Sequence, residues 1–195
     1  MTMREPNDSY LRLAQTQALD LYSGMGIVGH GTATLYAPDG SIKQCETFAN
    51  KITDYGDLYY ATRVAQGIAP TSLADIVSGD LMTGMKLGTN SAATAKAGAG
   101  AALNTYFALS NLAFTSVALV NGGSGLGYQV VYTCNWTTSV VLTAIVEAII
   151  GNAAATNATN TAAHTIARVT FASITKNSTD TFAIQWIHTF LGAGT

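Results

Sequence analysis

Residues 180 to 190 read Asp-Thr-Phe-Ala-Ile-Gln-Trp-Ile-His-Thr-Phe. Bulky apolar or aromatic side chains occupy every second position, and mostly small or polar residues lie between them. Because a β-strand sends successive side chains to opposite faces, this period of two predicts a strand with one buried face. The residues of that face are Phe182, Ile184, Trp186, His188 and Phe190.

The same period of two recurs along the chain. It appears in Gly31 to Ala37, in the returning segment Ser41 to Phe48, and in Tyr128 to Trp136. Residues 81 to 89 and 166 to 171 are further strand candidates, and turns rich in glycine and asparagine separate several of these segments. We therefore expect a mainly β protein, an antiparallel β-sandwich or barrel with one or two short helices and an N-terminal arm.

Two segments show helical spacing instead. One runs from Asp54 to Gln66, and the other lies within residues 8 to 22. The second predicts that residues 1–29 form an N-terminal arm or docking helix, followed by a β-sandwich-like domain over residues 30–195. Glycines at positions 24, 26, 29 and 31 are interpreted as a flexible joint between the two. A terminal helix folded back on its own domain is the alternative.

Charge is scarce in this chain. Charged residues make up 10% of it, against roughly 25% in ordinary soluble domains, and the net charge is -2. No Asp, Glu, Lys or Arg occurs between Ala97 and Val146. Such a surface lacks the repulsion that keeps monomers apart, which indicates that partner subunits cover it. The nine basic residues are scattered singly, so the sequence predicts neither nucleic acid nor a membrane as partner.

Two sets of residues are candidates for contacts between subunits. In the strand Tyr128 to Trp136 the odd-numbered positions alternate with an inward face that starts at Tyr128, and they are predicted to point outward without any charge. These outward positions are Gln129, Val131, Thr133 and Asn135, and the arm would add Leu11, Leu13, Leu21 and Tyr22. A strand without charged side chains on its outward face can pair with another subunit. We therefore expect a homo-oligomer, in the form of a trimer or another closed ring.

No catalytic constellation is recognisable. Gly24-Met-Gly26-Ile-Val-Gly29 has the spacing of a dinucleotide-binding loop, but a hairpin follows it where that loop requires a helix. The three histidines are isolated, which predicts that no metal or other cofactor is bound. Cys45 and Cys134 are expected to be free thiols, and Glu147 is expected to pair with Arg168 across neighbouring strands. The sequence thus predicts a protein that is not an enzyme.

A series of short motifs then resembles a family of small virion proteins of tailed bacteriophages. In order, the motifs are Met85-Lys-Leu-Gly88-Thr89, Ala144-Ile-Val-Glu147-Ala148, Ala167-Arg168-Val-Thr-Phe171, Lys176 and Asp180-Thr-Phe-Ala-Ile184-Gln-Trp186. The hairpin that begins at Ala33 and the helix near Asp57 are similar to the first half of that family. The resemblance covers roughly residues 30 to 190, and its motifs are structural.

This resemblance implies a structural virion protein, made in the host bacterial cytoplasm, whose partners are the major capsid protein or tail and collar proteins. Capsid decoration or cementing is the first expectation. A tail, collar or baseplate adaptor that anchors fibres is the alternative within the same class. A carbohydrate-binding receptor module is a third hypothesis, with Trp136 or Trp186 as stacking platform, although the aliphatic neighbours of both indicate that they are buried.

Overall fold

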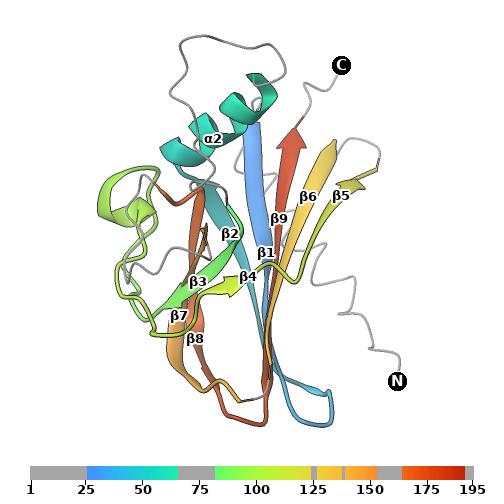
Figure 1. Ribbon diagram of the computed structural model, residues 1–195, viewed down its shortest axis with the longest axis vertical. Coiled ribbons are helices and arrows are strands. Elements are labelled where there is room, and N and C mark those ends of the chain that lie inside the picture. Colours follow the sequence, from blue (N-terminus) through green and yellow to red (C-terminus); the bar gives the residue numbers. More distant parts are fainter. Residues whose placement is uncertain (1–25, 66–81, 124–126, 138, 153–163, 192–195) are drawn as a thin grey trace.

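The computed structural model describes residues 26–65, 82–123, 127–137, 139–152 and 164–191 (Figure 1). These residues form two antiparallel sheets and one α-helix. The expected mainly β fold is confirmed, and its form is sandwich-like instead of a closed barrel. The candidate arm residues Leu11, Leu13, Leu21 and Tyr22 lie outside the described residues.

The two sheets are joined, so that their nine strands follow one continuous order, β4-β3-β7-β8-β2-β1-β9-β6-β5. Each described pair is antiparallel. Their bounds are Gly26–Tyr36 (β1), Ile42–Ile52 (β2), Gly84–Gly88 (β3), Leu112–Ala113 (β4), Ser116–Asn121 (β5), Tyr128–Trp136 (β6), Leu142–Gly151 (β7), Ala167–Lys176 (β8) and Thr181–Leu191 (β9). The helix α2 spans Asp54–Ala65, and a short 3₁₀ helix spans Gly98–Ala101.

The strands separate into two layers that share one narrow junction. β2, β1, β9, β6 and β5 form the first layer, and β8, β7, β3 and β4 form the second (Figure 1). Among the described residues, the backbone ladder between β2 and β8 joins them through two residue pairs, Lys51 with Arg168 and Ile52 with Ala167. The layers therefore diverge from this junction, and the core fills the space between them.

The strand Thr181–Leu191 is central to the first layer. It pairs with β1 along its whole length and with β6 on its other side. Phe182, Ile184, Trp186 and His188 are buried in the order predicted by the period of two, and the Phe48 ring meets the Trp186 ring edge-on with centroids 5.1 Å apart. The predicted face is thus confirmed from Phe182 to His188, whereas Phe190 is only partly buried, and Ile187 and Thr189 on the opposite face are buried as well.

The helix predicted between residues 54 and 66 is also confirmed. The hydroxyl of Thr53 accepts a hydrogen bond from the Gly56 amide at 2.9 Å, which satisfies one of the free amides at the helix start. Asp54 and Asp57 lie in the first turn and Arg63 in the last, as the helix dipole favours. The buried side chain of Tyr60 packs the helix against the core.

The interpretation of the glycines as a flexible joint is wrong from Gly26 onward. β1 begins at Gly26, so Gly26, Gly29 and Gly31 lie inside a paired strand. A Cβ atom built at Gly31 would lie 2.2 Å from the carbonyl oxygen of Gln185 and against the Phe48 ring. Gly29 and Gly31 are therefore required because neighbouring groups approach the strand closely, and the sequence alone did not separate that cause from flexibility.

Replacement of Gly31 by alanine is expected to lower the free energy of unfolding by about 1–3 kcal/mol, because the new methyl group must displace backbone or the Phe48 ring. Urea unfolding followed by tryptophan fluorescence measures the change. Gly40→Asn is the matched control: no atom lies within 4 Å of its Cβ position, and asparagine tolerates the positive φ found there. Equal losses in the two variants would contradict the packing argument.

Candidate functional site

A buried ion pair lies on the outer face of the second layer. The guanidinium of Arg168 in β8 donates from Nε to Oε2 of Glu147 in β7 at 2.9 Å, and Nη2 lies 2.9 Å from the same oxygen. The side chains of Glu147 and Arg168 are 0% and 1% exposed. The pairing predicted from the sequence is therefore confirmed, and because both charges are buried, loss of either partner would leave the other charge without compensation.

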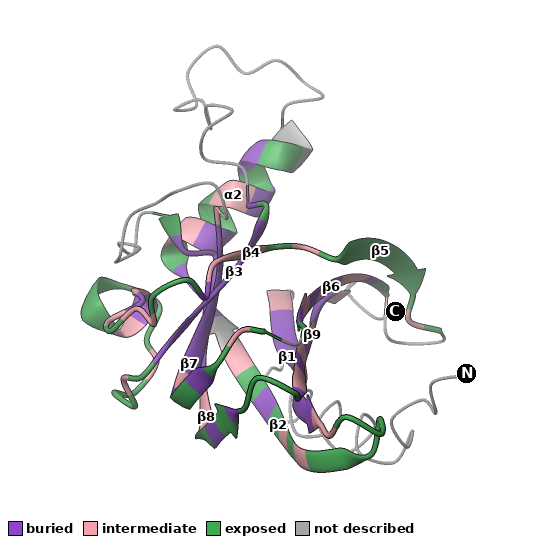
Figure 2. Cartoon of the chain, turned by 60° about the horizontal axis from the view of Figure 1, so that its bottom comes forward, coloured by how far each residue is buried: buried purple, intermediate pink, exposed green. Residues whose placement is uncertain are grey.

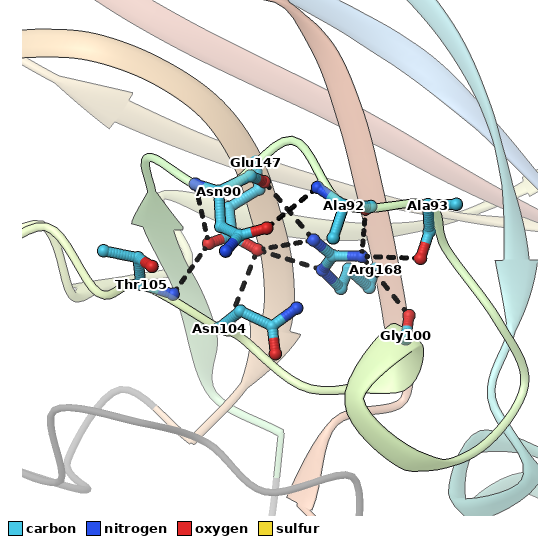
Figure 3. Close-up of polar contacts among 8 residues, drawn as sticks. All are labelled: Asn90, Ala92, Ala93, Gly100, Asn104, Thr105, Glu147 and Arg168. Carbon is cyan, nitrogen blue, oxygen red and sulfur yellow. Dashed lines mark hydrogen bonds and ion pairs between the residues drawn. The ribbon is translucent and has the colours of Figure 1, made fainter.

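The segment from Asn90 to Thr105 is held on this pair (Figure 3). Arg168 donates to the carbonyl oxygens of Ala92 at 2.9 Å and of Asn90 at 3.3 Å. Glu147 accepts from the amides of Thr105 at 3.0 Å and Asn90 at 3.2 Å. A segment of small residues with little apolar surface is thus fixed by its own backbone, and it shields the ion pair from water.

Arg168→Met is expected to destabilise the protein by about 3–5 kcal/mol, because it leaves the Glu147 carboxylate buried without its cation. Lys96→Met is the control, since it removes exposed ion pairs with Asp54 and Asp57 and is expected to cost less than about 1 kcal/mol. Thermal unfolding compares the two variants, and limited proteolysis reports whether the segment from Asn90 to Thr105 is released. A small loss in Arg168→Met would refute the role given to the pair.

A second buried polar group joins α2 to the first layer. The Tyr60 hydroxyl lies 3.0 Å from the Tyr132 hydroxyl and also hydrogen-bonds Nδ1 of His188. Nε2 of His188 has no partner among the described residues. The ring is therefore buried with one of its nitrogens paired to a tyrosine hydroxyl.

His30 is buried on the face of the first layer that lies opposite to the face of His188. Neither of its ring nitrogens has a hydrogen-bond partner within the described part of the chain. Burial lowers the pKa of His30 to about 4, and burial together with the nearby His30 lowers the pKa of His188 to about 3. Both rings are therefore neutral at physiological pH, and they can be buried because they are neutral.

These pKa values predict that stability falls on acidification. Between pH 6.5 and about 4 the unfolded chain binds protons at positions 30 and 188, and the folded chain binds none there, so each histidine removes up to about 1.4 kcal/mol per pH unit. Urea midpoints measured from pH 7.5 to 4.5 are expected to fall steadily. His30→Gln should reduce that slope by roughly half, whereas replacement of the exposed His164 should leave it unchanged. A flat profile in the unmodified protein would contradict this assignment.

Metal-ligating side chains are not clustered in the described residues. No group of three histidine, cysteine, aspartate or glutamate side chains is placed there to hold a metal ion. Cys45 and Cys134 are free thiols, as expected. Gly26 and Gly29 of the dinucleotide-like motif lie in β1, so their amides are not at the start of a helix.

The two tryptophans are part of the core. The Trp136 indole donates to the carbonyl oxygen of Ser110 at 2.8 Å, and the Trp186 indole donates to Oδ1 of Asn50 at 2.6 Å. Both side chains are buried. Neither ring can therefore stack on a sugar in this structure, which removes the platform that the carbohydrate-binding hypothesis required.

The candidate assembly residues of β6 lie on one face of the strand, but their exposure differs from the expectation. Gln129 is only 6% exposed and donates to the Thr189 hydroxyl at 3.1 Å, so the prediction that it faces solvent is wrong. Val131, Thr133 and Asn135 are partly exposed. Tyr128, which was predicted to point into the core, is exposed, because it lies beyond the end of the core.

Sequence reasoning missed the two-residue strand β4 and also the longer strand β5, Ser116–Asn121. It pairs with β6, so the open edge of the first layer belongs to β5 and not to β6 (Figure 2). All six of its residues are exposed. Its sequence, Ser-Val-Ala-Leu-Val-Asn, has apolar side chains on both faces and so lacks the period of two that revealed the other strands.

The distribution of charge is more extreme in space than in the sequence. After Lys96 the chain contains only four charged residues, Glu147, Arg168, Lys176 and Asp180, and all four are buried. Lys176 donates to the Val140 carbonyl oxygen at 2.5 Å, and Asp180 accepts from Lys43 at 2.9 Å. From Ala97 onward, the described surface therefore presents no charged side chain.

Comparison with known proteins adds no assignment. No family model, no curated protein and no solved structure matches this chain. Among the described residues, no helix has the length and apolar character needed to cross a membrane.

Proposed function

We propose that this chain is a non-enzymatic structural subunit of the virion of a tailed bacteriophage, where it decorates or cements the capsid through contacts between proteins. The observation that carries the proposal is the uncharged surface beyond Ala97. The charged residues after Ala97 are buried, in the Glu147–Arg168 pair and around Asp180.

Exposed apolar side chains concentrate on the same half. Six of the eight large hydrophobic residues that are exposed fall between Ala97 and Val146: Leu109, Val117, Leu119, Val120, Tyr128 and Val141. Monomers rarely leave a contiguous apolar surface without charge, because it associates. A subunit that stays bound to neighbouring subunits can have an exposed apolar surface without charge, because the neighbours cover that surface.

We infer a location in the virion because the motifs between Met85 and Trp186 resemble those of small phage structural proteins. Several of these motifs occupy positions that a structural role requires. Glu147 and Arg168 form the buried pair, and Lys176 and Asp180 hold the turn between β8 and β9, where the Asn177 amide donates to Asp180 at 3.1 Å. These residues stabilise a scaffold and leave no reactive group at the surface.

A tail, collar or baseplate adaptor is the second candidate, because such a part would also present an uncharged surface to its neighbours. The number of copies separates the two. Decoration requires copies on the order of hundreds per particle, and a tail or collar part requires about a dozen or fewer, since each location repeats with the symmetry of its assembly.

Quantitative mass spectrometry of purified phage particles, calibrated against the major capsid protein, tests the proposal. We expect peptides of this chain at a ratio near that of the capsid protein. A ratio close to that of tail proteins would move the chain to the tail or collar. Absence from particles that contain all other structural proteins would refute the proposed function.

A further inference from the structure

β5 is the long open edge of the described sheet. It ends the strand order and pairs with β6 alone. Figure 2 shows the whole strand exposed, standing out from the end of the first layer. Because only one side of its backbone is used for β6, the N–H and C=O groups of the other side have no strand beside them within the described residues.

The side chains of β5 do nothing to block this edge. The strand contains no proline, no glycine and no charged residue, which are the usual means by which a protein prevents pairing at an edge. Leu119 is 72% exposed, and Val117 and Val120 are exposed on opposite faces of the strand. The edge therefore offers both backbone hydrogen bonds and apolar contact to an added strand.

We propose that β5 pairs antiparallel with β5 of a second copy of this chain, so that the first layers of the two copies form one continuous sheet. The inference deepens the proposed function and rests on it for the presence of neighbouring copies. Pairing between equal strands around a two-fold axis places residues near the axis close to their own copies, so a charged residue there would lie near a like charge. β5 and the β6 residues beside it carry none.

A different protein would be a poorer occupant of this edge. Selection of a foreign strand relies on complementary charges or polar groups, and β5 offers only the terminal Ser116 and Asn121 as polar side chains. The other end of the sheet does not compete for a partner, since β4 has two residues and lies against β6, where Cys134 Sγ is 3.6 Å from the Leu112 carbonyl oxygen.

The two-fold symmetry also limits the register. An antiparallel pair of identical strands has its axis perpendicular to the sheet, so one residue must lie opposite its own copy. With Ala118 on the axis, Val117 of each copy lies opposite Leu119 of the other, on the face of β5 that continues the core side. This register places the most exposed side chain of the strand against another apolar residue, and we assign it.

The first test is the mass of the full chain in solution, measured by light scattering at micromolar concentration. The unmodified chain is expected to have twice its mass of 20.2 kDa. Leu119→Lys should be a monomer, because it places two like charges near the axis, and Leu109→Lys, which changes an exposed leucine outside the strand, should stay a dimer. A monomeric unmodified chain, or a dimer that survives Leu119→Lys, would overturn the inference.

Cysteine cross-linking tests the register without dependence on the fold of a charged variant. In a Cys45→Ser background, Ala118→Cys should form a disulfide-linked dimer under mild oxidation, since residues directly opposite have close Cβ atoms. Ser116→Cys should not, because its two copies would be about 13 Å apart along the strands. Burial raises the pKa of the Cys134 thiol to about 12, which keeps that cysteine unreactive. Cross-linking of Ser116→Cys in place of Ala118→Cys would refute the assigned register.

These measurements use the purified chain alone, so they are independent of its place in a particle. A monomer that is nevertheless found in virions would refute only the pairing through β5. A dimer that is absent from virions would refute only the proposed function.

Discussion

The buried ion pair between Glu147 and Arg168 is the interaction on which the rest of the structure depends. It lies beside the junction of the two layers, where Arg168 also pairs with Lys51 in the backbone ladder. Burying two charges is costly unless every donor and acceptor finds a partner. The backbone from Asn90 to Thr105 supplies those partners, so the pair and the segment that covers it are stable only together.

This arrangement explains how the chain can be so poor in charge and still have a unique fold. Each charged residue after Lys96 satisfies backbone groups or another charge inside the protein, and none is left for the surface. Exposed charges are confined to earlier elements, such as Asp39 in the β1–β2 turn and Asp57 in α2. The exposed charges of the described residues therefore lie on elements before Ala97, and the surface that later residues contribute is suited to contact with protein.

The sequence predicted the elements in which one face is buried and the other is not, because alternation reports that difference directly. Alternation of residue types therefore found β6, β9 and the β1–β2 hairpin, although β1 is buried on both faces, and the scarcity of charges led to the Glu147–Arg168 pair. It did not find β5, because a strand exposed on both faces has no alternation to detect. It misjudged Gln129 because a hydrogen bond to Thr189, formed only after strands distant in sequence meet, decides the burial of that side chain.

An exposed apolar edge normally carries the risk of open-ended association, since a sheet with two free edges can add copies at both. Here the two ends of the sheet are unequal. β4 is two residues long, and its carbonyl groups already lie near Cys134 of β6. Among the described strands, only β5 presents a long open edge to an added strand. If a copy of the same strand occupies it, both edges are used in one step and no further copy can add there. With this pairing, the inequality of the two ends means that the exposed edge leads to a closed dimer and not to open-ended aggregation.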